Sequence, residues 1–361
     1  PYGDEESTNS ILEGPEAHNF APFKDPRPDV PASERYKAIG GRYPVVFQSK
    51  DGIAWEKMRG DERLLAGRLD SQNVVFWDTV TERYLAYSRL WSAEDEEGGR
   101  RRLIRYSESE GTDFFSWEDH GRLEYPPHTP LENLYTSAVH PVPGAEHILA
   151  AFPRGFVRGR RKVPYAGRPA LGDTVFMTSR DGVRWDRSFR KAWLGPGPDF
   201  RNWTSGGMLA WGIVFTGPNE MSLYVNQHAG FAGAHLRRLT LPRHRFASFR
   251  AGYEAGELVT RPLRFEGRHL ILNYRTSAAG TIYVELQTED GDPIEGFTLR
   301  DADPLYGDEL DAVVSWNGND NLSSLEDRRW VRLRILMQDA DLYSLRFAPD
   351  TQPQHFQQDG L

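Results

Sequence analysis

The sequence predicts an all-β protein, a five-bladed β-propeller with an incomplete or missing N-terminal blade followed by a β-sandwich. A strand–turn–tryptophan unit recurs in the first part of the chain, as expected where similar sheets repeat around an axis. Short β-rich runs fall into four sets in the same part. After Gly256 the turn unit stops and alternating strands continue. We therefore expect a catalytic propeller at 1–255, a sandwich at 256–348 and a polar tail at 349–361.

The recurring unit reads SKDGIAW at 49–55 and SRDGVRW at 179–185, and a degenerate copy, SEGTDFFSW, lies at 109–117. Ser and Asp side chains bond nearby backbone N–H groups and so fix a tight turn. Gly52 and Gly182 allow the positive φ that such a turn needs. The tryptophan then supplies a large ring that packs against a neighbouring sheet. We expect each unit to end one hairpin and to press it against the next sheet.

The four sets follow one another with similar spacing. The expected strands are 19–23, 36–39, 43–48 and 55–58 in the first set; 73–77, 84–89 and 102–107 in the second; 134–141, 147–152 and 174–178 in the third; and 208–215, 220–227, 235–241 and 246–250 in the fourth. Four sets are one fewer than a closed five-bladed ring requires. Either the N-terminus contributes more strands than the pattern reveals, or an upstream blade is missing from this chain.

Composition limits the function classes. The net charge of -8 argues against a nucleic-acid partner. The absence of cysteine excludes disulfides, a thiol nucleophile and zinc–thiolate sites. No apolar run approaches the ~18–20 residues of a membrane span, so we expect no membrane partner. Histidines are scattered without ligand spacing, so we expect neither a metal nor a cofactor.

In a propeller, the residues just before each innermost strand converge at one mouth of the central channel. Two carboxylates occupy such positions on adjacent sets, and we predict Asp70 and Glu132 as the catalytic pair. The predicted substrate-binding residues are Asn19, Gln72, Asn73, Tyr135, Arg154, Asn202 and Trp203. A carbohydrate is the expected substrate because sugar rings pack on flat amphipathic side chains.

Hydrolysis of a glycosidic bond needs two carboxyl groups facing each other across it. Apolar neighbours of Glu132 suit a general acid, and Asp70 would then be the base or an electrostatic stabiliser. The alternative is that both are turn carboxylates. We interpret Asp25 and Asp78, at the far ends of inner strands, as turn residues.

A basic loop runs from Arg154 to Arg168 and is the densest positive patch of this acidic chain. Guanidinium groups bind carboxylate or sulfate in bidentate fashion. The loop would therefore hold an anionic glycan, or it is simply solvated.

The segments that contain Asp70 and Glu132 resemble the propeller glycoside hydrolases of families 32 and 43 and their bacterial relatives with a C-terminal sandwich. The segment 70–87 is similar to the Arg-Asp-Pro segment of family 32, and 132–139 to its Glu-Cys-Pro segment, which bears the acid. Here Leu69 and Ser71 flank Asp70, Asn133 follows Glu132, and Asn19 stands where a third carboxylate is expected. The resemblance implies an exo-acting glycoside hydrolase.

Two alternatives remain open at this point. A sialidase-like hydrolase of anionic glycans would need three converging arginines, for which Arg89, Arg105 and Arg154 are candidates. A non-catalytic carbohydrate-binding propeller would hold its carboxyl groups too far apart for hydrolysis.

Overall fold

The structure, a computed structural model, describes residues 10–67, 69–94, 99–163, 171–204, 206–325 and 330–352. Within these ranges the chain is all-β, as predicted, and its only helices are short 3₁₀ turns. They are η1 (Pro15–Ala17), η2 (Ala32–Glu34), η3 (Phe200–Asn202) and η4 (Ser323–Leu325). In the described residues, no helix has the length and apolarity to span a membrane.

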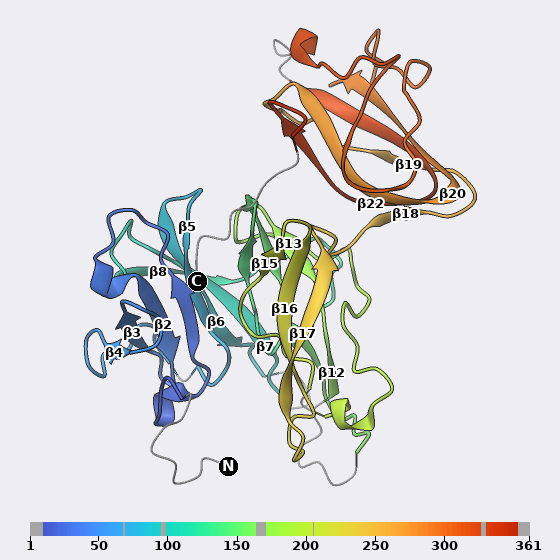
Figure 1. The fold of residues 1–361 in the computed structure, drawn as a ribbon. Coiled ribbons are helices and arrows are strands. Elements are labelled where there is room, and N and C mark those ends of the chain that lie inside the picture. Colours follow the sequence, from blue (N-terminus) through green and yellow to red (C-terminus); the bar gives the residue numbers. More distant parts are fainter. Residues whose placement is uncertain are drawn as a thin grey trace. The chain divides into compact units, whose positions relative to one another are not determined.

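The chain forms two compact units (Figure 1). The first comprises Pro1–Val214 and Leu223–Leu239, and the second comprises Phe215–Ser222 and Thr240–Leu361. The boundary expected near Gly256 thus falls within the second unit. Residues 1–9 of the N-terminal connector, Arg168 of the basic loop and 353–361 of the tail lie outside the described residues.

Two four-stranded antiparallel sheets open the first unit; one matches the first predicted set, and the other adds β8 to the three strands predicted for the second set. One has the order β1-β2-β3-β4, and the other has the order β5-β6-β7-β8. Their strands are β1 (Ala21–Lys24), β2 (Tyr36–Gly40), β3 (Val45–Ser49), β4 (Glu56–Lys57), β5 (Val74–Asp78), β6 (Arg83–Trp91), β7 (Arg102–Ser109) and β8 (Trp117–Arg122). In both sheets, strands adjacent in sequence pair with each other, which is the meander expected of consecutive hairpins.

The third sheet has the order β14-β13-β10-β9, with strands β9 (His140–Val142), β10 (Ala145–Ala151), β13 (Met177–Ser179) and β14 (Trp185–Asp186). Of the strand predicted at 134–141, only the end forms, as the start of β9. Leu134 makes an isolated bridge to Gly155. The basic segment after Arg154 is not a simple loop. Its start forms β11 (Arg154–Val157), which pairs with β12 (Leu171–Thr174) in a separate hairpin.

The fourth predicted set is a three-stranded sheet of β15 (Val214–Gly217), β16 (Glu220–Gln227) and β17 (His235–Pro242). The fourth strand expected there, at 246–250, was wrong. The chain instead forms β18 (Phe249–Ala251), which pairs with β22 of the second unit. A partner about 90 residues away in sequence leaves no local signal.

The three turn units form as predicted. In the first, Asp51 Oδ1 accepts from the N–H groups of Ile53 and Ala54, both at 2.9 Å. In the last, Asp181 Oδ1 accepts from Val183 at 3.0 Å and from Arg184 at 2.7 Å. Gly52 and Gly182 have φ of 77° and 78°. Each unit joins the third strand of a sheet to its short fourth strand, so the tryptophan comes at the start of the outer edge.

The second unit is a five-stranded antiparallel sheet with β19 (Gly256–Val259) paired to β22. Two long strands, β20 (His269–Thr288) and β22 (Val331–Ala348), run side by side and bend together (Figure 1). The sequence pattern predicts separate strands at 270–274 and 281–287, which β20 joins, and at 331–337 and 343–347, which β22 joins. The register shifts between Thr276 and Thr281. There a Cβ on Gly280 would come within 2.4 Å of the Asp339 carbonyl oxygen, so only glycine fits. The last strand of this sheet is β21 (Asp308–Val313).

Candidate active site

The segment before β5 contacts the segments before β9 and β15. Ser71 Oγ donates to the Tyr135 carbonyl at 2.6 Å. Gln72 donates to the Leu209 carbonyl at 2.9 Å and accepts from the Ala138 N–H at 3.1 Å. These contacts join residues up to 137 positions apart in sequence. They also engage both ends of the Gln72 amide, so this side chain holds three segments together.

Asn73 is likewise a structural residue. Its side chain is buried, donates to the carbonyls of Leu69 and Ser71, and accepts from the Arg89 N–H at 3.0 Å. Both the donor and the acceptor of this amide are therefore engaged in holding the turn before β5. The structure offers no support for the substrate-binding role that the sequence predicted for Asn73.

Asp70 is partly exposed and faces cations. His18 Nε2 lies 2.9 Å from Asp70 Oδ1, and Arg42 Nε lies 3.9 Å from Oδ2. Burial is the largest single influence on the pKa of Asp70 and raises it. The hydrogen bond to His18 and the charges of Arg42, His18 and Arg89 together outweigh burial, so this pKa falls below its usual range. Asp70 is therefore a carboxylate at neutral pH, which suits a base or a charge stabiliser.

Glu132 contacts a guanidinium instead of the apolar neighbours expected from its sequence. The buried Arg187 donates to Glu132 Oε2 from Nε at 3.0 Å and also from Nη2. Arg187 is held in turn by the carbonyls of Phe176 and Phe189. A carboxylate held this way is arranged to accept protons or attack. The sequence around Glu132 did not indicate this guanidinium, and the role of Glu132 as the acid stays a prediction.

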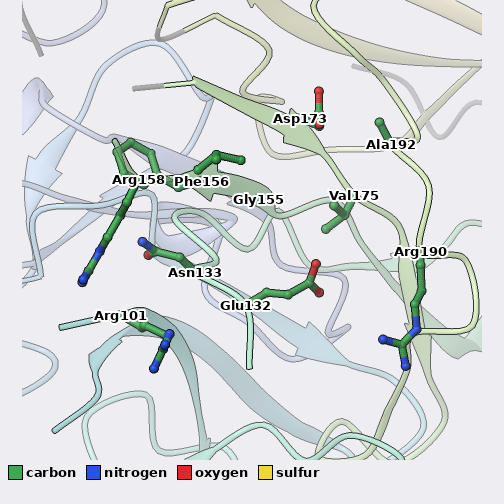
Figure 2. A pocket seen from close by; sticks show the side chains of 11 residues that line it. Arg101, Glu132, Asn133, Gly155, Phe156, Arg158, Asp173, Val175, Arg190 and Ala192 are labelled. Atoms are coloured by element: carbon green, nitrogen blue, oxygen red, sulfur yellow. The ribbon is translucent and has the colours of Figure 1, made fainter. Parts of the chain in front are cut away.

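Glu132 lines a pocket of about 420 Å³ (Figure 2). Besides Glu132, its charged lining residues are Arg101, Arg158, Asp173 and Arg190. Its apolar wall includes Phe156 and Val175. The pocket thus brings Glu132 together with a second carboxylate, Asp173 on β12. Asp70 is not part of its lining.

Asn133 adds an amide to the same pocket. Its Oδ1 accepts from the Arg102 N–H at 2.8 Å. Its Nδ2 is buried and has no hydrogen-bond partner among the residues that the structure describes. A buried donor of this kind costs free energy unless a ligand or water meets it.

Arginines and aromatic rings alternate beside the pocket. Arg89 and Arg102 each lie 5.1 Å from the centre of the Tyr135 ring, and both also lie over Trp91. Arg102 further lies 4.8 Å from the ring of Phe156. The Tyr135 ring therefore packs against guanidinium groups, which is a cation–π arrangement. Stacking of a sugar on Tyr135, as predicted, would have to compete with these contacts.

Arg105, proposed with Arg89 and Arg154 as an arginine trio, is engaged elsewhere. It donates to Ser88 Oγ at 3.1 Å and pairs with Asp119 at 3.2 Å. Arg102 takes the place beside Tyr135. Arg154 is 2% exposed and donates to the Thr204 carbonyl at 2.7 Å. Burial lowers the pKa of Arg154 to about 10.

The remaining predicted residues lie in varied settings. Asn202 is buried and accepts from the His228 N–H at 3.0 Å. Trp203 donates from Nε1 to the Gly197 carbonyl at 2.7 Å. Asn19 has a positive φ of 58°, and its buried Nδ2 has no partner within the described ranges. The Asn19 side chain therefore keeps a donor without an acceptor in the described chain.

The pocket residues Arg101, Asp173 and Arg190, and Arg187 behind Glu132, were not predicted from the sequence. Glu132 and Arg187 are 55 residues apart, and nothing in the local sequence of either indicates the other. Asp173 directly precedes the strand expected at 174–178 and was given no role. Asn133 could have been predicted as a site residue, since it follows Glu132 directly in the sequence.

One group of described side chains has the geometry for a metal ion. The ligand atoms of Glu108, Glu118 and His120 lie within 4.8 Å of one another. Glu108, however, already accepts hydrogen bonds from Arg83 at 2.6 Å and Tyr106 at 2.7 Å. An arginine beside the central carboxylate disfavours a cation, so this cluster is explained by its ion pairs.

No family model and no curated protein matches the sequence. The chain resembles solved structures of glycoside hydrolases. A family 43 arabinoxylan arabinofuranohydrolase from Bacillus subtilis is 11% identical and has a TM-score of 0.39, covering 91% of this chain and 79% of that one. A family 32 β-fructofuranosidase from Bombyx mori is 10% identical, with a TM-score of 0.32 and coverage of 87% and 74%. These are the two families that the sequence itself resembles.

A third similar structure belongs to an enzyme of another class. It is an N-acetylgalactosamine deacetylase from F. plautii, 10% identical, with a TM-score of 0.40, covering 67% of this chain and 93% of that one. TM-scores at this level do not establish a shared fold. The proposals below therefore rest on the residues and contacts of this chain.

Proposed function

We propose that the chain is a glycoside hydrolase, exo-acting on an oligo- or polysaccharide, whose reaction takes place in the pocket lined by Glu132. The observation that carries the proposal is the presence of two carboxylates, Glu132 and Asp173, in one pocket of about 420 Å³. Pockets for small ligands span ≈ 300–1,000 Å³. Hydrolysis of a glycosidic bond needs a pair of carboxyl groups with a sugar between them.

We further infer that the sheets of the first unit are propeller blades and that the second unit is a sandwich. Three four-stranded meanders and a three-stranded sheet follow one another in sequence. The segments before β5, β9 and β15 contact one another, as blade starts do around a central axis. This arrangement supports a ring in which one blade is incomplete.

Within the pocket, Arg187 donates two hydrogen bonds to Glu132 Oε2 and so orients Glu132 to act as nucleophile or as the base that activates water. The other carboxyl group then donates the proton to the leaving oxygen. Asp173 is the first candidate because it lines the same pocket. Asp70, predicted from the sequence, is the second candidate, although its lowered pKa suits charge stabilisation better than proton donation.

Substitution of the three acids tests the proposal. Reducing-sugar release from a glycan library would be measured for wild type and for Glu132→Gln, Asp173→Asn and Asp70→Asn. Glu124→Gln serves as a matched control, because Glu124 is an exposed carboxylate that pairs only with Arg184 in the described chain. We expect Glu132→Gln to lower kcat by about 10³-fold or more and the control to be unchanged. Equal turnover of Glu132→Gln and wild type on a cleaved glycan would refute the assignment.

A non-catalytic carbohydrate-binding role is the second candidate function. It is favoured by one observation: both predicted acids are already in ion pairs, Glu132 with Arg187 and Asp70 with Arg42. Binding of a glycan by wild type without any release of reducing sugar would support this role.

A further inference from the structure

The pocket around Glu132 is rich in positive charge. Arg101, Arg158 and Arg190 line it, and Arg187 lies directly against Glu132. Two carboxylates oppose these four guanidinium groups. Because the whole chain carries a net charge of -8, the local excess of positive charge does not follow from composition.

Two of the lining arginines, Arg101 and Arg190, have no carboxylate partner in the described chain. Among the residues that the structure describes, the side chains of Arg101 and Arg190 take part in no ion pair. Arg190 is exposed, and Arg101 is half-buried. Figure 2 shows Arg101 and Arg158 on the side of Glu132 where Asn133 lies, and Arg190 on the other side. The three arginines come from separate segments, yet all line the same pocket.

The charge of Glu132 does not satisfy these arginines, because Arg187 already neutralises it. Asp173 is the one remaining carboxylate of the lining. The buried Nδ2 of Asn133 also lacks an acceptor in the described chain. The pocket therefore offers more donors than acceptors, and a ligand that supplies anionic oxygens would balance it.

We propose that the sugar bound in this pocket carries an anionic group, a carboxylate or a sulfate, which Arg101 binds together with the Asn133 amide. A planar guanidinium binds either group through two parallel hydrogen bonds. Arg190, on the other side of Glu132, adds a second positive charge that attracts the anionic group. This inference rests on the proposed function for its placement of the sugar, and it narrows the substrate to acidic glycans.

Binding separates this inference from the proposed function. Calorimetry on the Glu132→Gln protein, which cannot turn over substrate, would use four probes: trigalacturonate, its methyl ester, galactose 6-sulfate and galactose. We expect at least one acidic probe to bind ten-fold or more tightly than its uncharged counterpart. The two pairs also distinguish a carboxylate ligand from a sulfate ligand.

Charge removal identifies the residue responsible. Adding Arg101→Gln should weaken binding of the acidic probe by about ten-fold. Arg180→Gln, which removes an exposed arginine from the last turn unit outside the pocket, should leave it within two-fold. Raising the salt concentration should weaken acidic binding only, because surface charges are screened.

The outcomes are distinct. If neither acidic probe binds better than its neutral counterpart, or if Arg101→Gln has no effect, the inference is wrong, even where wild type cleaves a neutral glycan. If an acidic probe binds through Arg101 while wild type releases no sugar from any acidic glycan, the inference holds and the proposed hydrolase activity fails.

Discussion

Asp25, at the residue scale, is a fully buried carboxylate beside the end of β1. It accepts from Lys37 Nζ at 2.9 Å and from the Tyr84 hydroxyl at 2.5 Å, and both donors are buried. The sequence predicted a turn residue without catalytic function. Its ion pair could not be predicted, because Lys37 lies on the next strand and Tyr84 belongs to another sheet. Asp78, by contrast, accepts from Thr81 three residues later, so its turn role was readable locally and is confirmed.

Replacing Asp25 by Asn should destabilise the first unit by about 3–5 kcal/mol, because Lys37 would remain buried without its counter-charge. Urea unfolding measures this. The double variant Asp25→Leu with Lys37→Met removes both charges and should cost much less than the single variant. A single-variant loss below about 1 kcal/mol would show that water or other groups compensate Lys37.

The same residue predicts a pH dependence. Burial is the largest single influence on the pKa of Asp25 and raises it. The hydrogen bonds from Tyr84 and Lys37 together outweigh burial, so the net shift of this pKa is downward. A lowered folded-state pKa contributes stability that is present above the ordinary value of about 3.9 and is lost as pH falls. We expect the stability difference between wild type and Asp25→Asn to shrink below about pH 4. A constant difference down to pH 2 would contradict this.

His18 should control the ionisation of Asp70. Among the lowering influences on the pKa of Asp70, the hydrogen bond to His18 comes first. His18→Ala should therefore raise that pKa toward its usual value, as measured by NMR titration of the carboxyl carbon. Asp51 is an internal control, since its pKa is lowered mainly by the N–H groups of Ala54 and Ile53. An unchanged Asp70 titration would mean that Arg42 and Arg89 dominate.

At the scale of elements, predictability follows the range of the hydrogen bonds. The turn units were predicted because their bonds join residues two or three positions apart. The hairpin β11–β12 and strand β18 were missed because pairing partners are distant or lie beyond a long basic segment. Apart from Glu132 and the basic segment that contains Arg158, the pocket residues were missed for the same reason. They come from five separate segments that only the folded chain brings together.

The two complete turn units offer a matched pair of substitutions. Trp185 is 1% exposed and donates to the Gly182 carbonyl at 2.9 Å, whereas Trp55 makes the same bond to Gly52 but is only half-buried. Trp185→Phe should cost about 2 kcal/mol through the lost hydrogen bond and the cavity. Trp55→Phe should cost about half as much. Equal losses in urea unfolding would contradict the difference in burial.

At the scale of the whole molecule, each compact unit contains its own apolar core. Leu85 belongs to the core of the first unit and Leu272 to that of the second. Because large-to-small changes in a core cost about 2–5 kcal/mol, Leu85→Ala and Leu272→Ala should lower different calorimetric transitions. If both variants shift one shared transition equally, the units unfold as a single cooperative body.

The central claim is that the pocket lined by Glu132 binds a sugar for hydrolysis, and a crystal structure of Glu132→Gln soaked with trigalacturonate tests it most directly. We predict a sugar ring between residue 132 and Asp173, with its carboxylate against Arg101 and Asn133. Clear density for the trisaccharide at any other place on the protein, with this pocket holding only solvent, would contradict the account.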